Sequence, residues 1–265
     1  MRGQTFSSMV TAAIGLVLTG CAPPATMAPG DGTWSGRDTA RMYDFNSPDN
    51  WVPRGVPTGT ATIPADSPAV PFVRASQPTT LAAIKLTGNL GLSVDPSNTL
   101  VVTQRDSGIT MCCGQAQLYV TGELTGDVTI GSPTSPVGNQ ISGYGTIKGS
   151  VIQHSGTIGG SRGSAGERTL TVVGNYRITT AIGATVSDVL PGSATSLDVK
   201  GTASIGGGTL FIAVADSVTS APPYKVLTAG RVDGKYGNVI LYPPGSPWKA
   251  DVTYSSTDVT VTLRK

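Results

Sequence analysis

GTIKGSV, at residues 145–151, is typical of the stretches that decide the fold of this chain. Apolar and polar residues alternate over a few positions and glycine closes each run, as expected for short strands with one buried face and tight turns between them. DVTIG at 127–131 and TLTVVGNY at 169–176 follow the same pattern, which is consistent from Leu81 onward. The sequence therefore predicts an all-β domain.

The turns that close these strands recur at irregular spacing. From Gly88 to Gly122, Gly143, Gly174 and Gly201 the intervals are 34, 21, 31 and 27 residues. Irregular coils of this size favour a right-handed parallel β-helix with variable loops over a strict-repeat solenoid. About eight coils stacked at ~4.8 Å would form a rod roughly 40 Å long. A β-sandwich is the alternative, although only 6% of the chain is aromatic, which is little for a sandwich core.

Composition narrows the functional classes. Charged residues make up 13% of the chain and the net charge is +2, with no basic run, so nucleic-acid binding has no electrostatic basis. The sequence contains no G-x-S-x-G, H-E-x-x-H or P-loop motif, and we expect no cofactor apart from a covalent lipid.

The N-terminus has the layout of a secretory signal. Arg2 precedes an apolar run at 9–18, which is too short to span a membrane and is followed by two prolines. LTGC at 18–21 resembles the lipobox of bacterial lipoproteins, which implies that Cys21 is lipidated and becomes the first mature residue. Ala22 after it favours the outer membrane by the same resemblance. An ordinary signal peptide with a cysteine at its cleavage site is the alternative.

Three parts follow from this reading: a signal peptide at 1–20, a flexible tether at 21–42 that is rich in Pro, Gly and Ser, and a β-helix domain at 43–265. We expect Trp51 to cover the first coil, because the end of a stack exposes an apolar core.

Two regions resemble the passenger domains of autotransporters, the pertactin-like right-handed β-helices. The first is NW at 50–51 with GVPTGTATI at 55–63. The second is a series of four motifs: VGNY at 173–176, DVKGTA at 198–203, GGTL at 207–210 and YKVLTAG at 224–230. The resemblance covers residues 165–265 best and implies that this region caps the stack. Autotransporters continue into a C-terminal barrel, whereas this sequence stops at Lys265, so we expect the lipid to provide the attachment.

Candidate chemical groups are few. Cys112 and Cys113 are adjacent, and an ordinary disulfide does not fit between neighbours. They could form a redox switch or a thiolate clamp, but we favour a small buried or oxidised turn.

His154 is the single histidine. A catalytic or metal site there would need carboxylates from neighbouring coils, such as Glu123, Asp127 or Glu167. The favoured interpretation is an exposed or hydrogen-bonded histidine on a strand.

Two further features have competing interpretations. The glycine-rich run at 159–166 is interpreted as a projecting loop, and an anion cradle is the alternative. Five aromatic residues gather near the C-terminus and are interpreted as the cover of the last coil, with a sugar-stacking platform as the alternative: Tyr224, Tyr236, Tyr242, Tyr254 and Trp248.

The functional hypothesis is a lipid-anchored, non-catalytic envelope protein, facing the periplasm or the outside, that acts in adhesion by binding a glycan or a protein. We assign no catalytic or metal-binding residue, because the 14 Asp and 2 Glu are scattered. A polysaccharide-active lyase or hydrolase is the first alternative and would need acids with Arg or Lys on one face. A structural or assembly role is the second, and would need an apolar exposed patch at the passenger-like end.

Overall fold

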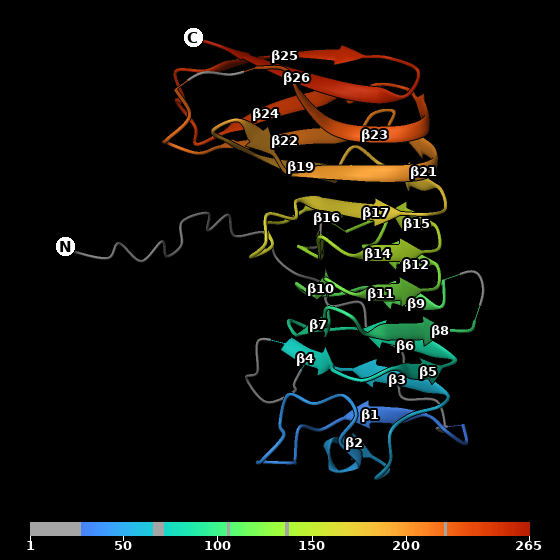
Figure 1. The fold of residues 1–265 in the computed structure, drawn as a ribbon. Coiled ribbons are helices and arrows are strands. Elements are labelled where there is room, and N and C mark those ends of the chain that lie inside the picture. The colour runs from blue at the N-terminus through green and yellow to red at the C-terminus, as the bar shows by residue number, and fades with distance from the viewer. Residues whose placement is uncertain (1–27, 66–71, 105–106, 136–137, 220–221) are drawn as a thin grey trace, which may run out of the picture.

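The structure is a computed structural model that describes residues 28–65, 72–104, 107–135, 138–219 and 222–265. The chain forms a parallel β-solenoid of about eight turns (Figure 1). The described residues contain no α-helix and only one short 3-10 turn, η1 (Pro48–Asn50). The predicted β-helix is therefore confirmed over the alternative β-sandwich.

One side of the rod is a parallel ladder of eight strands within a nine-stranded sheet. In order along the rod these strands are β4 (Phe72–Ala75), β7 (Gly91–Val94), β10 (Gln117–Val120), β13 (Gln140–Gly143), β16 (Gly156–Gly160), β19 (Gly183–Leu190), β22 (Thr209–Val214) and β24 (Asn238–Tyr242). The ninth, β20 (Ser193–Ala194), forms a hairpin with β19. Neighbouring strands lie ~4.8 Å apart.

The seventeen-stranded sheet supplies the other two sides. One ladder contains β5 (Thr79–Leu81), β8 (Thr99–Val102), β11 (Glu123–Thr125), β14 (Thr146–Lys148) and β17 (Thr169–Val172). The other contains β3 (Thr60–Ile63), β6 (Ala83–Leu86), β9 (Ile109–Met111), β12 (Val128–Ile130), β15 (Val151–Gln153) and β18 (Tyr176–Ile178). The long strands β21 (Ser196–Ser204) and β23 (Tyr224–Asp233) then pass across both ladders.

Register between coils builds the core. Leu92, Leu118, Ile141, Ile158 and Thr185 lie at stacked positions and are fully buried. They are separated by 26, 23, 17 and 27 residues, because the loops at the corners differ in length while the strands keep their register. Each buried aliphatic side chain in this stack contributes about 1.5–3 kcal/mol.

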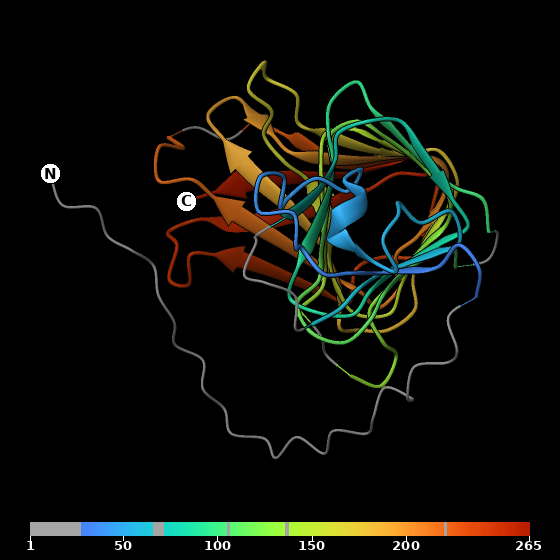
Figure 2. The ribbon, with the colours of Figure 1, turned by 90° about the horizontal axis from the view of Figure 1, so that it is seen from below.

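The N-terminal end of the rod, which faces the viewer in Figure 2, is closed by a cluster of aromatic rings. Trp51 packs edge-on against Trp34 and Phe45, with ring centroids 5.1 and 4.8 Å away, and all three rings are buried. The Trp51 indole Nε1 donates to the carbonyl oxygen of Phe45 at 2.8 Å. The expected cover of the first coil by Trp51 is confirmed.

One short strand at this end lies in the range predicted as a tether. β1 (Gly32–Trp34) pairs with β2 (Trp51–Val52) and with β3. The range 21–42 is thus ordered from at least residue 32, because Trp34 buries its ring against the first coil. The predicted signal peptide at 1–20 and Cys21 lie outside the described residues.

The C-terminal end is closed on one sheet only. β26 (Asp258–Arg264) pairs antiparallel with β23 and with β25 (Lys249–Tyr254), which completes the seventeen-stranded sheet. β24 pairs with β22 alone among the described strands and is the last strand of its sheet.

A polar cluster lies inside the last coils. The Tyr176 hydroxyl donates to Gln153 Oε1 at 2.5 Å and lies 3.0 Å from Thr185 Oγ1, to which the Tyr236 hydroxyl donates at 2.9 Å. Burial raises the pKa of both phenols, so they stay protonated. Hydrogen bonding offsets the cost of burying these groups.

Candidate functional site

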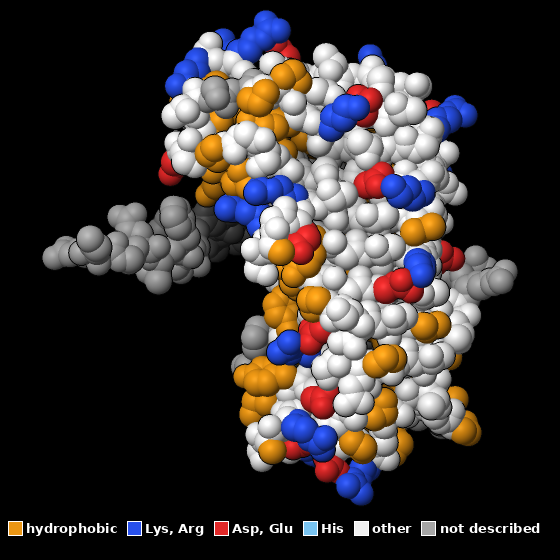
Figure 3. All heavy atoms as spheres, in the orientation of Figure 1, with side chains coloured by type: hydrophobic (Ala, Val, Ile, Leu, Met, Phe, Trp, Pro, Cys, Tyr) orange, Lys and Arg blue, Asp and Glu red, His pale blue; other side chains and the backbone are white. Residues whose placement is uncertain are grey.

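The outer face of the nine-stranded sheet carries both exposed hydrophobic side chains and surface hollows. Figure 3 shows hydrophobic side chains gathered in two areas along this side, near β4–β10 and near β22–β24. Three surface hollows lie on this face. This face is therefore the candidate binding surface of the protein.

A row of three aromatic rings occupies the N-terminal half of this face. The ring centroid of Phe72 on β4 lies 6.2 Å from that of Tyr119 on β10. The Tyr119 centroid lies 6.4 Å from that of Tyr144, which follows β13. The intervening strand carries Gly91 in register with Phe72, and a Cβ at residue 91 would collide with the Phe72 ring. Glycine at this position lets Phe72 lean toward Tyr119.

A charged pair borders the aromatic row. Arg74 Nη2 donates to Asp95 Oδ2 at 2.7 Å, Arg74 Nε lies 3.3 Å from Asp95 Oδ1, and Ser93 Oγ donates to that oxygen at 3.3 Å. This two-point contact with Asp95 raises the pKa of Arg74. The positive charge of Arg74 is therefore matched by the carboxylate that it contacts.

Rings and ion pair together line an open hollow of about 330 Å³. We call it the aromatic groove and define it by Phe72, Arg74, Asp95, Tyr119 and Tyr144. A neighbouring hollow of about 270 Å³ shares Arg74 and Asp95 and extends the groove toward the N-terminal end, where Arg41, Tyr43, Asp44 and Ser76 line it.

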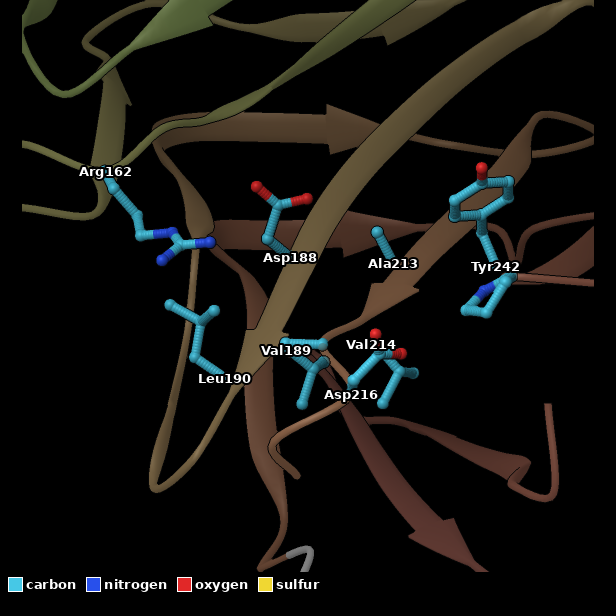
Figure 4. A pocket seen from close by; sticks show the side chains of 10 residues that line it. Arg162, Asp188, Val189, Leu190, Ala213, Val214, Asp216 and Tyr242 are labelled. Carbon is cyan, nitrogen blue, oxygen red and sulfur yellow. The ribbon is translucent and has the colours of Figure 1, made fainter. Parts of the chain in front are cut away.

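A second hollow, of about 370 Å³, lies near the C-terminal end of the same face. Asp188, Ala213 and Tyr242 are in register on β19, β22 and β24, and Figure 4 shows Ala213 between the two larger side chains. Arg162 and Asp216 are the other charged residues of the lining, and the rest of it is apolar: Val189, Leu190, Val214, Ala215 and Pro243. We call this hollow the carboxylate pocket and define it by Arg162, Asp188, Ala213, Asp216 and Tyr242.

Asp188 is the chemically unusual group of this pocket. Its carboxylate is half-buried and accepts no hydrogen bond from the described residues. Burial raises the pKa of Asp188, and the positive charge of Arg162 opposes that shift. Arg162 points toward it (Figure 4), but no cation among the described residues lies within ion-pair distance.

The glycine-rich segment separates the two hollows. Gly159 and Gly160 belong to β16, and the residues after them form the projecting loop that the sequence predicted. Ser161 Oγ contacts the Tyr119 hydroxyl at 3.3 Å, Arg162 lines the carboxylate pocket, and the charge of Glu167 contributes to the raised pKa of Tyr144. The loop thus contributes side chains to both sites.

His154 lies away from this face, just after β15 on the seventeen-stranded sheet. Its Nδ1 lies 2.7 Å from Thr179 Oγ1. Glu123 pairs with Lys148 at 2.7 Å, and Asp127 accepts from the Ser150 amide. His154 is hydrogen-bonded, as the sequence interpretation favoured, although it lies one residue beyond the strand. The described residues contain no group of three or more His, Cys, Asp or Glu placed to hold a metal ion.

The cysteine pair lies in a turn after β9. Cys112 is partly buried and Cys113 is exposed with φ of +63°, next to Gly114 with φ of +98°. Neither residue reaches the outer face of the nine-stranded sheet, so the structure gives them no role in the two sites described above.

The C-terminal aromatic residues divide into two groups. Tyr224 and Tyr236 are buried in the core, with Trp248 and Tyr254 partly buried against it, as expected for a cover. Tyr242 instead stacks on Phe211 at 6.0 Å on the outer face.

Sequence reasoning missed the aromatic groove. Alternation places Tyr119 on the solvent side of its strand, so an exposed tyrosine could have been read from the sequence. The meeting of Phe72, Tyr119 and Tyr144 depends on the register between coils, which irregular loop lengths conceal.

Comparison with known proteins adds no assignment: no protein-family model matches the chain, and no curated protein is significantly similar to it in sequence. The described residues contain no apolar helix of membrane-spanning length.

Proposed function

We propose that this protein is a lipid-anchored, non-catalytic protein of the bacterial envelope that acts in adhesion through the outer face of its nine-stranded sheet. The observation that carries the proposal is the aromatic groove, in which three partly exposed rings and a neutral ion pair line one open surface. Shallow, open surfaces with aromatic anchors suit glycans or partner proteins better than small enclosed ligands.

The resemblance of residues 165–265 to autotransporter passengers supports the adhesion class, because a β-solenoid presents a long surface away from its attachment point. That resemblance is an analogy of fold and sequence style. The specific support comes from the groove.

Attachment through Cys21 has a direct test. Cys21→Ser should move the protein from the membrane fraction to the soluble fraction, because a lipidated cysteine carries the acyl chains that hold such a protein. Fractionation with immunoblotting measures this. A mutant that stays with the membrane would refute lipidation as the anchor.

Binding has its own test. Purified full-length protein is immobilised and exposed to glycans and to proteins from envelope extracts, in parallel with the double variant Tyr119→Ala/Tyr144→Ala. The proposal expects a bound species that the variant loses while its unfolding transition stays cooperative. Equal binding by both proteins would move the function away from the groove.

A polysaccharide-active enzyme is the second candidate, and the carboxylate pocket favours it. Burial raises the pKa of Asp188, which is the direction that a proton donor requires, and Asp216 and Arg162 share its hollow. The enzyme hypothesis expects release of new reducing ends or unsaturated sugars from polysaccharides, abolished by Asp188→Asn. Absence of turnover across polysaccharides that the protein binds would leave the non-catalytic function.

An assembly role is the third candidate. The exposed residues Val239, Ile240 and Tyr242 on β24 form an apolar edge at the passenger-like end. This role expects Ile240→Lys to release an envelope protein that co-purifies with the wild-type chain.

A further inference from the structure

The aromatic groove has a specific ligand chemistry, and identifying it rests on the proposed binding function. We propose that the groove binds a neutral, extended polysaccharide, with the chain lying along the rod and its pyranose rings against Tyr119, Tyr144 and Phe72.

Charge is the first argument. Among the described residues, the charged groups that line the hollow are Arg74 and Asp95, which neutralise each other at 2.7 Å, and its continuation adds one charge of each sign, Arg41 and Asp44. An acidic polymer would gain from a cationic surface and would have to compete with Asp95 for Arg74. A neutral sugar leaves the pair intact, because its hydroxyl groups can donate to free lone pairs of the carboxylate and accept from the remaining guanidinium N–H groups.

Hydroxyl-bearing side chains are the second argument. Ser93 and Thr121 line the same hollow, and the Tyr119 hydroxyl contacts Ser161 Oγ at its edge. Donors and acceptors thus alternate beside apolar ring faces. Sugar rings have the matching character, with axial C–H groups on their faces and hydroxyls around their rims.

Geometry is the third argument. The rings come from different coils, and coils repeat at ~4.8 Å along the rod, which is close to the advance of one pyranose unit in a polysaccharide. The continuation of the groove toward Arg41 and Tyr43 adds length in the same direction. A straight polysaccharide that lies along the rod therefore contacts one aromatic ring or polar group for every one or two sugar units.

Rigidity of the site is the fourth argument. Phe72 is held over Gly91, and the Arg74 guanidinium is fixed by two contacts to Asp95. Side chains that are already ordered lose little conformational freedom on binding. The groove is thus preorganised for a flat ligand.

The test is isothermal titration of the full-length protein with soluble hexasaccharides of β-linked glucose, mannose, galactose and N-acetylglucosamine, with polygalacturonate as the acidic probe and a proline-rich peptide as the protein probe. We expect at least one neutral hexasaccharide to bind, with an affinity that changes less than about twofold between 0.05 and 0.5 M salt.

Variants locate the binding. Tyr119→Ala should weaken the neutral sugar at least about tenfold, since stacking of a ring on an aromatic side chain contributes on the scale of one decade in affinity. Tyr119→Phe, which keeps the ring, should stay within about threefold. Ile152→Ala removes an exposed side chain from β15, on the other sheet, and should have no effect.

The possible results distinguish a failure of the proposed ligand class from a failure of the proposed binding function. Preference for polygalacturonate, for the proline-rich peptide, or for none of the neutral sugars overturns the ligand class. Binding of a neutral sugar that survives Tyr119→Ala overturns the site. If an envelope protein is still captured through Tyr119 and Tyr144 in either case, the binding function stands without this ligand, and if nothing is captured, both fail.

Discussion

The two ends of the solenoid solve the same physical problem in different ways. At the N-terminal end, side chains close the core: Trp34, Phe45 and Trp51 are almost fully buried across the first coil. At the C-terminal end, the hairpin of β25 and β26 closes one sheet, while β24 leaves Val239, Ile240 and Tyr242 at 40%, 46% and 45% exposure. The N-terminal end is therefore fully closed. At the C-terminal end the seventeen-stranded sheet is closed, whereas the nine-stranded sheet leaves an exposed apolar edge at β24.

The largest expected effect concerns the closed end. Trp51→Ala removes the ring that contacts both other aromatic residues and should lower the free energy of unfolding by about 3–5 kcal/mol. Chemical denaturation followed by circular dichroism measures it. Trp51→Phe is the control and should cost clearly less, and a loss below about 1 kcal/mol for Trp51→Ala would show that the rings do not close the stack.

The polar cluster near the other end should give a smaller effect. Tyr176→Phe removes a buried hydroxyl and leaves Gln153 Oε1 without that donor, at a cost of about 1–3 kcal/mol. Tyr236→Phe should cost less, because Thr185 keeps its contact with Tyr176. The same denaturation experiment ranks the two variants, and the reverse order would contradict the described network.

A substitution at the exposed edge of β24 should change self-association of the protein rather than its stability. Ile240→Lys should change the unfolding free energy by no more than about 0.5 kcal/mol, as is usual for exposed positions, and should reduce self-association at high protein concentration. Light scattering against concentration measures it. Ser142→Lys, on the outer face in the middle of the same sheet, is the matched control, and equal scattering by wild type and both variants would leave the edge without a role in contact.

The smallest effect is a pH dependence in the carboxylate pocket. Because the folded state raises the pKa of Asp188 above its ordinary 3.8, this group favours folding at acidic pH, and that contribution is lost as pH rises through the folded pKa. Asp188→Asn should therefore gain stability relative to wild type as pH rises from about 3 toward neutrality. A difference between the two proteins that does not change with pH would show that burial does not perturb this carboxylate.

Sequence patterns predicted the coarse architecture because alternation and glycine turns are local signals. They placed strands at 127–131 and 169–176 and a covering tryptophan at residue 51, all of which the structure contains. β1 and the buried Trp34 lie inside the range 21–42 that was predicted as a tether, because Trp34 packs on Trp51, which is distant in sequence. Alternation also misleads on β19, where Thr185 and Ser187 are buried and Val186 faces outward.

The sites were harder to predict, because each is assembled across coils. Ala213 pairs with Asp188 and with Tyr242, which are 25 and 29 positions away from it in the sequence. The loop lengths that set these pairings follow no period, so the chain gives no local sign that the residues meet. Cys21, the one site residue named from sequence, lies outside the described residues and stays a prediction.

The direction of the backbone hydrogen bonds has a mechanical consequence. In a parallel solenoid these bonds run along the long axis and join each coil only to its neighbours. A force that separates the two ends of the rod therefore loads the interfaces between coils in series. The weakest interface yields first, and the neighbouring coils then separate one after another. Because interfaces in series bear the same load, the buried Trp34–Trp51 contact raises the force at which the N-terminal coil separates from the rod.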